Sequence, residues 1–278
     1  MAFVPQRSKE GELYLISESQ KADFHEKGLA ILENFLTEGE LKTIESTYED
    51  YMKNGSSAKQ GKDFCDMSQP FNTPREDYQI VNAMLPRVYY PVLQNNVFER
   101  LAKCVVKQIY PDVEMDIDYD QLLDKTPKSK DAIFAWHQDM AYWPPASLTP
   151  DTRTVTFSLA LDSTTKRNGC IKYIPGSGKA KTLRSHKPIG TSREEAHAIQ
   201  ISVDEEAENV EYAQVKRGSV SIHDEYVVHG SGGNYSDGRR RTYVIAFRSK
   251  DTIRKERDVG FTHSHNDTTN WDVFNQWK

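Results

Sequence analysis

Apolar side chains in the first third of the chain recur mainly at helical intervals, with glycines and prolines marking the breaks. Residues 19–28 predict a helix that ends on a glycine, and residues 29–35 follow as a short apolar strand. Thr37 and Glu40 have the spacing of a capping box, in which each side chain pairs with the other residue's backbone amide. A second helix is therefore expected to begin after Thr37 and to end at Gly55.

The next part of the chain combines a loop pattern with a second helical pattern. Residues 56–75 are rich in Ser, Gly, Lys and Pro, which predicts an irregular loop, and we take this loop as a candidate lid. Residues 78–110 carry apolar side chains at helical intervals, interrupted at Pro86 and Pro91 because proline lacks a backbone donor. Residues 1–112 are thus expected to be helical overall.

The period changes after Pro111, where apolar and polar positions begin to alternate as in half-buried strands. Short strands after a helical part predict a mainly β fold, a β-sandwich or double-sheet barrel with helices on one face. Because no repeat or linker interrupts the chain, we expect one domain, with a helical part at 1–112, a strand-rich core at about 113–250 and a tail at 251–278. The clearest alternating segments are 113–123, 154–162, 212–224 and 241–249.

Composition and charge exclude several classes of protein. The 278 residues are 37% hydrophobic and 28% charged, with a formal net charge of −5, which is typical of a soluble globular protein. Such a charge is unsuited to neutralising nucleic-acid phosphates, and no apolar stretch is long enough to span a membrane. The three cysteines show no disulfide or zinc-site spacing. We expect a cytoplasmic protein with a small-molecule substrate and no nucleic-acid or membrane partner, and the oligomeric state stays open.

Candidate chemistry begins in the stretch "FAWHQDMAYW", which holds a histidine and an aspartate among aromatic and apolar residues. His137 and Asp139 are two apart and would point to the same face of a strand. His229 ends another strand-like run, just before a glycine-rich turn. Two imidazoles and one carboxylate form the facial triad that binds Fe(II) and leaves three coordination positions open. Taken alone, the His-x-Asp pair is explained better by a polar surface strand.

Arg240 favours a metal site over a surface strand, because it follows His229 after the turn and would lie on the next strand. A planar guanidinium binds a carboxylate through two parallel hydrogen bonds. An iron with open positions beside such an arginine suits a 2-oxoacid cosubstrate, whose keto-acid end meets the metal and whose far carboxylate meets the arginine. Of Arg239, Arg240 and Arg241, only the middle one is expected to reach the pocket, since its neighbours point the other way.

Three segments, "WHQDMAYW", "RNGCIKYIPGS" and "HGSGGNYSDGRRR", resemble motifs of the phytanoyl-CoA hydroxylase-like (PhyH) family of iron(II)/2-oxoglutarate oxygenases, in the family's order. The resemblance spans roughly residues 118–248 and implies a double-stranded β-helix, or jelly-roll, core. It also implies that iron is bound by His137, Asp139 and His229, and that 2-oxoglutarate is bound by Arg240.

The resemblance carries over to further positions in the pocket. It implies that Ser231 places a hydroxyl near the far carboxylate of the cosubstrate, and that Gln121 contacts the cosubstrate's other end. A tryptophan of the family's name-giving enzyme is replaced by Ser158, so the two pockets differ there. Tyr142 and Trp143 directly follow the metal motif and are candidates to line the substrate mouth, although core packing explains them equally well.

Other histidines are given structural roles. His223 precedes His229 by an even number of positions, yet we expect it on the opposite face and read it as structural. His263, His265 and Asp267 in "THSHND" offer a rival metal set, but their segment has no strand periodicity. We therefore expect a solvated or loosely ordered tail there.

The sequence favours a non-haem iron dioxygenase that uses Fe(II), 2-oxoglutarate and O2. It would hydroxylate or otherwise oxidise an unactivated C–H of a small or medium-sized metabolite and release succinate and CO2. Asp139 favours oxygenation, because halogenating relatives of the family lack this carboxylate. Two alternatives stay open: a catalytically idle jelly-roll module that senses a 2-oxoacid, and a zinc-dependent hydrolase, for which no general base is evident near His137.

Overall fold

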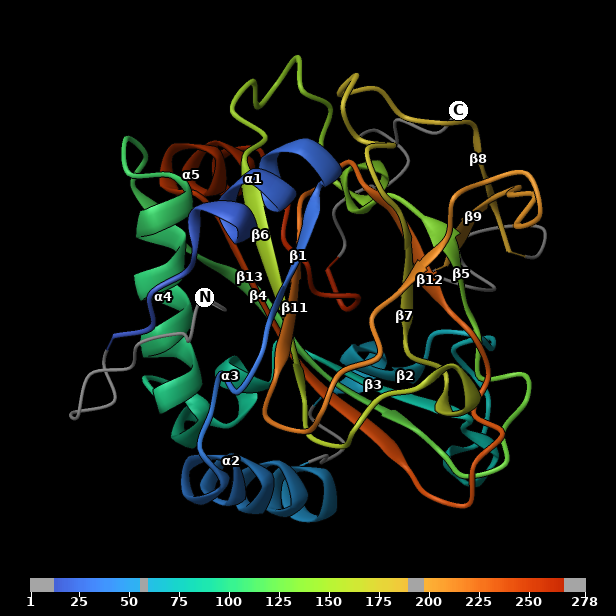
Figure 1. The fold of residues 1–278 in the computed structure, drawn as a ribbon. Coiled ribbons are helices and arrows are strands. Elements are labelled where there is room, and N and C mark those ends of the chain that lie inside the picture. The colour runs from blue at the N-terminus through green and yellow to red at the C-terminus, as the bar shows by residue number, and fades with distance from the viewer. Residues whose placement is uncertain (1–12, 56–59, 190–197, 268–278) are drawn as a thin grey trace.

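Two antiparallel sheets face one another in the computed structural model, which describes residues 13–55, 60–189 and 198–267 (Figure 1). The larger sheet has seven strands in the order β1 (Leu29–Leu32), β11 (Val220–His223), β6 (Thr154–Ala160), β13 (Arg240–Ser249), β4 (Met115–Lys125), β3 (Ile80–Met84) and β2 (Phe64–Asp66). The smaller sheet has four strands in the order β10 (Glu211–Tyr212), β7 (Ile171–Ile174), β12 (Val228–Ser231) and β5 (Phe134–His137). A separate hairpin pairs β8 (His186–Pro188) with β9 (Ile199–Ile201). The predicted mainly β fold is confirmed.

Helices cover the outer face of the larger sheet and continue around its edge (Figure 1). Ser17 and Thr37 each complete a capping box with the residue three positions on. The box at Thr37 is the predicted one, whereas the first helix begins at Glu18, one residue before the predicted start. The first helix ends at Gly28, whose φ of 80° is the left-handed conformation that glycine adopts at low cost. The α-helices among the described residues are α1 (Glu18–Lys27), α2 (Glu38–Asp50), α3 (Pro86–Tyr89), α4 (Val97–Ile109) and α5 (Lys250–Asp258).

The alternation along β6 and β13 separates the main core from the cavity. Phe157 and Phe247 point outward from the sheet pair and pack with residues of the covering helices. Thr156, Ser158 and Thr242 point to the opposite face, between the sheets, where they line a cavity. Because side chains of a strand alternate between faces, the same two strands build the apolar core and position polar groups around the cavity.

The first third of the chain is less helical than expected. Residues 80–84 form β3 rather than part of a helix, and residues 64–66 of the expected loop form β2. A short run of buried residues such as "IVNAM" fits a buried strand as well as a helix, so the periodicity did not separate the two. β1 and β2 form the two edges of the larger sheet, so strands from the first third of the chain belong to the same sheet as strands of the expected core.

The C-terminal segment is also different from the expectation of a solvated tail. After α5, the chain packs Phe261, His263 and His265 against the body of the protein, with exposed fractions of 0%, 5% and 8%. Polar contacts hold this segment against the body of the protein, among them the hydrogen bond that the His265 backbone amide donates to Asp63. Within the part of the chain that the structure describes, no helix combines the length and apolar character needed to cross a membrane.

Candidate active site

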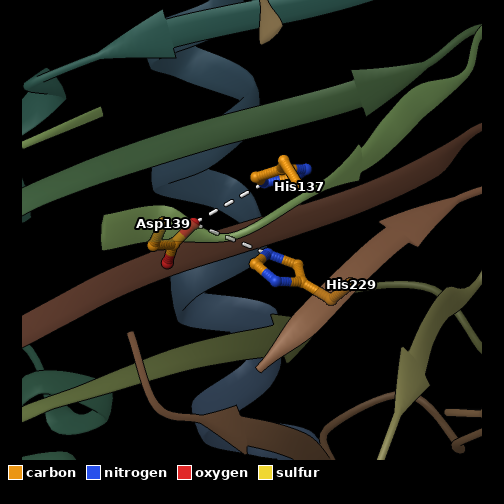
Figure 2. A group of neighbouring side chains, drawn as sticks. All are labelled: His137, Asp139 and His229. Atoms are coloured by element: carbon orange, nitrogen blue, oxygen red, sulfur yellow. Dashed lines mark ion pairs between the residues drawn. The ribbon is translucent and has the colours of Figure 1, made fainter. Parts of the chain in front are cut away.

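The structure brings together His137, Asp139 and His229, which the sequence placed in one group (Figure 2). His137 ends β5 and lies opposite His229 of β12 in the antiparallel register. Asp139 begins the 3-10 turn that follows β5, so only one member of the expected strand pair lies on the strand itself. The Nε2 atoms of His137 and His229 lie 3.6 Å and 3.5 Å from Asp139 Oδ1. Ligands at right angles around an ion about 2.1 Å away would be about 3 Å apart, so this spacing is close to that of a metal site.

Both imidazoles are fixed with the same nitrogen facing Asp139. His137 Nδ1 lies 2.7 Å from the carbonyl oxygen of Ala135, and His229 Nδ1 lies 3.1 Å from that of Val227. A backbone carbonyl can only accept, so each Nδ1 carries the proton and each Nε2 keeps its lone pair. This is the arrangement in which outer hydrogen bonds orient metal-binding histidines.

The electrostatics of the group favour a neutral imidazole beside an ionised carboxylate. Burial opposes ionisation of Asp139, but the neighbouring histidines outweigh it and hold the pKa of Asp139 well below its ordinary value. Burial, together with the nearby rings of His137 and His223, lowers the pKa of His229. A deprotonated carboxylate and a neutral imidazole are the forms that bind a metal ion.

His223 is placed differently from the expectation of an opposite-face, structural residue. Its Nε2 lies 3.3 Å from Asp139 Oδ2, and its ring lines the cavity. Positions six apart in one regular strand share a face, so alternation did not support the expected opposite face; in the structure His223 and His229 lie on β11 and β12, which belong to different sheets. His223 thus contacts the second oxygen of Asp139 and orients that carboxylate toward the other two histidines.

Arg240 lies at the first residue of β13, buried with an exposed fraction of 2%. Its Nη atoms donate to Thr242 Oγ1 at 2.7 Å, to the carbonyl of Gly169 at 2.8 Å and to Ser231 Oγ at 3.5 Å, and its Nε has no partner among the described residues. None of these partners is a carboxylate, and burial lowers the pKa of Arg240 to about 10. Gly169 fits here without a side chain, since a Cβ would lie 2.3 Å from the carbonyl oxygen of Gly232.

The other two arginines of the run point away from the cavity, as predicted. Arg239 pairs with Asp124 and Glu49. Arg241 pairs with acidic residues of α2 and with Asp162, at 2.6 Å from its nearest oxygen. The alternation of β13 therefore leaves Arg240 as the one arginine of the three that lines the cavity.

Lys125 is a functional candidate that the sequence argument missed. It is fully buried in β4, opposite Arg240 in the strand register, and its Nζ donates to Ser231 Oγ at 2.7 Å and to the carbonyl of Gly232. Burial and the charge of Arg240 hold the pKa of Lys125 well below its ordinary value. The only available signal was its even spacing from Gln121 along the alternating strand, which places both on one face. Two buried basic side chains, neither bonded to a carboxylate among the residues that the structure describes, form a ready site for an anion.

The remaining candidates from the sequence line the same cavity. The side-chain amide of Gln121 donates a hydrogen bond to Met84 Sδ at 2.7 Å. Ser158 lies on the face of β6 that lines the cavity. Tyr142 and Trp143 both line the cavity, and Tyr142 also accepts a hydrogen bond from the backbone of Ile199 at 3.1 Å. Trp143 is also part of an apolar cluster, so its expected roles in the core and in the cavity wall coexist.

With this geometry in place, comparison with known proteins decides the family. The family model described as "Phytanoyl-CoA dioxygenase (PhyH)" matches residues 24–242, which is most of the chain.

The chain belongs to the phytanoyl-CoA dioxygenase (PhyH) family.

Relatives within the PhyH family are distant in sequence. A probable alpha-ketoglutarate-dependent hypophosphite dioxygenase of Stutzerimonas stutzeri is 34% identical over 119 residues, which are 42% of this chain and 40% of that protein. The match thus spans less than half of that relative. The peroxisomal phytanoyl-CoA dioxygenase of Rattus norvegicus is 24% identical over 260 residues, which cover 85% of this chain and 70% of that enzyme.

Solved structures share the jelly-roll fold. EvdO2 from Micromonospora carbonacea var. aurantiaca, in complex with 2-oxoglutarate, has a TM-score of 0.66 at 22% identity, over 84% of this chain and 91% of that chain. EctD from S. alaskensis, with 2-oxoglutarate and 5-hydroxyectoine, has a TM-score of 0.63 at 20% identity, over 85% and 77% of the two chains. The expected jelly-roll core is confirmed.

As a PhyH-family member, the chain is a non-haem iron enzyme of the 2-oxoglutarate-dependent dioxygenase class, with Fe(II) as its metal and 2-oxoglutarate and O2 as cosubstrates. The residues present fit these groups. Two neutral imidazoles and one carboxylate converge as Fe(II) requires, and a buried arginine without an acidic partner stands ready for a carboxylate.

Proposed function

We propose that the protein oxidises an unactivated C–H of a small or medium-sized metabolite, with release of succinate and CO2. In this proposal His137, Asp139 and His229 hold Fe(II). Arg240, Ser231 and Lys125 bind the far carboxylate of 2-oxoglutarate, and Gln121 contacts its other end. The reaction balances as R–H, 2-oxoglutarate and O2 giving R–OH, succinate and CO2.

The observation that carries the proposal is a contrast between the two ends of one cavity. At one end, three ligand atoms lie within 4.8 Å of one another with their lone pairs directed inward. At the other end, Arg240 is buried without any bonded carboxylate among the described residues. A buried cation is costly unless it is paired, so the pocket is built to receive a ligand carboxylate.

The chain's own residues position the reactants and exclude water. Bound Fe(II) and 2-oxoglutarate would supply O2 activation coupled to oxidative decarboxylation. His223 holds the second oxygen of Asp139, which keeps the carboxylate in one orientation. Tyr119, Met84 and Trp143 cluster beside the metal group and form an apolar wall that keeps water from the reacting C–H.

Membership of the family restricts the class of reaction more than it restricts the substrate. The names of the relatives refer to hypophosphite, phytanoyl-CoA and ectoine, so membership of the family is compatible with very different molecules. We therefore propose a screen in which succinate release is measured across carnitine-like, amino-acid, phosphonate and acyl-CoA compounds. A compound that raises succinate release above the rate without substrate identifies the class. Cytoplasmic location stays a prediction.

The metal and cosubstrate assignments are tested by anaerobic titration with Fe(II) and 2-oxoglutarate. We expect a metal-to-ligand charge-transfer band that is lost in His137→Ala and kept in His25→Ala, which removes an exposed histidine of α1. If the wild-type protein gives no band, or if His137→Ala keeps it, the proposal is wrong. A band without succinate formation from any compound would favour the idle binding module instead.

A further inference from the structure

The C-terminal segment Phe261–His265 forms part of the cavity wall. Both His263 and His265 line the cavity, together with Tyr119 and Trp143. The ring of His263 lies 4.4 Å from that of Tyr119 and 6.1 Å from that of Trp143, centroid to centroid. The mechanism proposed above gives this segment no role, although it contributes two imidazoles to the space where a substrate would bind.

Asp118 determines which nitrogen of His263 carries a proton. The carboxylate of Asp118 is fully buried, and its Oδ2 lies 2.8 Å from His263 Nε2. Arg248 and Arg257 also pair with this carboxylate, so it is ionised and can only accept hydrogen bonds. His263 Nε2 therefore carries the proton and donates it to Asp118.

The charges around Asp118 are balanced without a second proton on His263. Arg248 pairs with Glu256 at 2.6 Å as well as with Asp118, so two guanidinium groups, those of Arg248 and Arg257, face two carboxylates. A neutral imidazole leaves this buried group without excess charge. His263 Nδ1 has no hydrogen-bond partner among the described residues, and it therefore keeps its lone pair.

This lone pair is the polar feature that His263 offers to a molecule in the cavity. The ring lines the cavity with Nε2 turned to Asp118, which leaves Nδ1 for a bound group. The exposed fraction of His263 is only 5%, and a buried acceptor without a partner needs a donor from a ligand or from water. The rings of Tyr119, Trp143 and Phe261 surround it.

His265 has the same polarity. Its Nδ1 lies 3.2 Å from the carbonyl oxygen of Lys62, which can only accept, so Nδ1 carries the proton and Nε2 keeps the lone pair. Both imidazoles of the segment are therefore held in the form whose second nitrogen is an acceptor. The C-terminal wall thus favours a hydrogen-bond donor over an oxyanion.

Charges near the wall disfavour a cationic donor. Among the described residues that line the cavity, Asp139 is the sole carboxylate, and it belongs to the metal group. The guanidinium of Arg248 lies 4.0 Å from the centre of the Trp143 ring, so a second cation beside this ring would meet a positive charge. A buried ammonium without a carboxylate is costly, whereas a hydroxyl donates a hydrogen bond without carrying charge.

We propose that His263 is a substrate-binding residue whose Nδ1 accepts a hydrogen bond from a hydroxyl group of a neutral alcohol. The aromatic side chains around it pack against the apolar part of the alcohol. Asp118 is a positioning residue that fixes the ring and its proton through Nε2. The inference rests on the proposed function, because it takes the metal and cosubstrate ends of the cavity as filled.

The first measurement is the position of the ring proton in the full chain without metal or cosubstrate. Nitrogen resonances of labelled histidine rings distinguish a nitrogen that carries a proton from one that keeps its lone pair. We expect a proton on Nε2 of His263 and none on Nδ1. A proton on Nδ1 would overturn the inference, whatever the reaction of the protein.

The second measurement is binding to the full chain loaded with 2-oxoglutarate and Zn(II), a redox-inert substitute for Fe(II). The probes share one ring and differ in the group attached to it. Cyclohexanol is a neutral donor, cyclohexanone only accepts, cyclohexylammonium is a charged donor and cyclohexanecarboxylate is an anion. Calorimetry gives their affinities, and the ring-nitrogen resonances report which histidine is contacted.

The variants separate the two nitrogens of the His263 ring. In His263→Gln, the amide reaches toward Asp118 but leaves no acceptor at the position of Nδ1. In His263→Asn, the amide oxygen lies near the position of Nδ1 but the side chain falls short of Asp118. His25→Gln is the matched control, since His25 is exposed on α1.

We expect cyclohexanol to bind about ten-fold more tightly than the other three probes, because it alone pairs Nδ1 without adding charge. Its binding should shift the Nδ1 resonance of His263 and leave those of His25 unchanged. His263→Gln should remove most of the preference for the alcohol over the ketone, His263→Asn should restore part of it, and His25→Gln should keep it.

Other outcomes overturn the inference. It is wrong if cyclohexanol does not bind, if any other probe binds as tightly, or if His263→Gln keeps the preference for the alcohol. If His263→Gln does not fold, the preference of the wild-type protein and the shift of its Nδ1 resonance decide. Failure of the proposed function is distinguishable, because the wild-type protein would then bind neither 2-oxoglutarate nor metal.

Discussion

Arg240 and Arg248 lie on the same face of β13 and are both fully buried, yet their surroundings are opposite. Three hydrogen bonds of 2.6 to 2.8 Å join the Nη atoms of Arg248 to the carboxylates of Asp118 and Glu256. Arg240 has only neutral oxygen partners. A buried arginine with its acids stabilises the fold, whereas one without them is available for a ligand carboxylate.

We therefore predict that Arg240→Lys weakens 2-oxoglutarate binding by roughly ten-fold to a hundred-fold. A lysine keeps the charge but cannot form the two parallel hydrogen bonds of a guanidinium, and each ten-fold loss corresponds to about 1.4 kcal/mol. Calorimetric titration of the metal-loaded protein measures the change. Arg239→Lys is the control, since Arg239 pairs with Asp124 and Glu49 and does not line the cavity, so the substitution should leave the affinity within about two-fold.

Titration of Glu225 is expected to make the stability of the fold depend on pH. Burial, with the charge of Asp224, outweighs Lys181 and raises the pKa of Glu225 to about 7. One of its carboxylate oxygens accepts from Thr152 at 2.8 Å, and the other has no partner among the described residues. An acid whose pKa is raised on folding binds more protons in the folded state, so the free energy of unfolding falls as the pH rises from about 4.5 to about 7.

Glu225→Gln should remove that part of the pH dependence, on the order of 2 to 3 kcal/mol between pH 5 and pH 8. Urea unfolding of both proteins at the two pH values measures it. Asp120, whose pKa burial raises to about 8, gives the same trend in both proteins and cancels in the comparison. Equal losses of stability in the two proteins would contradict the prediction.

The sequence identified the residues that carry a recognisable motif and missed those that reach the site by topology. His137, Asp139, His229 and Arg240 have a spacing and order that can be read directly from the chain, and the structure brings them together. Asp118 is buried at a bulge in β4, which leaves no mark in an alternating pattern.

The same limit explains the C-terminal histidines and His223. A segment without periodicity gives no sign that it folds back over a cavity, so His263 and His265 were read as solvated. For His223, strand alternation holds within one strand only, and the chain changes sheet before His229.

Gln138 links the short segment between β5 and its 3-10 turn to two other parts of the chain, residues 182–186 and Tyr226. Its side-chain amide donates to the carbonyls of Thr182 and Tyr226 at 3.1 Å and 2.7 Å, and its oxygen accepts from the Arg184 amide at 2.8 Å. Its own backbone amide donates to His186 Nε2 at 3.2 Å. The residue between the two candidate metal ligands is thus fully buried and bonded on all sides.

Gln138→Ala is predicted to cost about 1 to 3 kcal/mol of stability, because it leaves buried backbone groups unpaired. It should also lower metal affinity roughly ten-fold or more, since the neighbouring ligands lose a support that orients them. Urea unfolding and competitive metal titration measure the two effects. Gln94→Ala, which removes one exposed hydrogen bond, should change neither; a similar loss in both variants would argue against a positioning role.

The predictability of each element depended on local signals. α2 carries a capping box, a sharp N-terminal signal that involves residues close in sequence, and it begins where predicted. β3 has no such signal: its five residues are a strand because they pair with β4 on one side and β2 on the other. Partners distant in sequence decide such segments, and a window of sequence does not contain them.

Removal of the metal should affect the whole molecule, since the three candidate ligands join the β5–β12 pair to the turn after β5. A ligand that binds only the folded state at one hundred times its dissociation constant stabilises it by about 2.7 kcal/mol. We predict that a chelator lowers the Tm by roughly 5 °C or more. Scanning calorimetry of the wild-type protein and of His137→Ala measures this, and the variant should show little response to the chelator.

The order of strands in the larger sheet has a consequence for biosynthesis. Its two edges, β1 and β2, are translated before the other described strands, whereas β13, which pairs with β6 and β4 near the middle, is translated after them. Until Ser249 has emerged, the two halves of the sheet have no common neighbour, and their inner edges stay open to pairing with other chains. Ribosome-bound chains that stop before Arg240 should therefore remain sensitive to protease, and resistance should arise only once β13 is outside the exit tunnel.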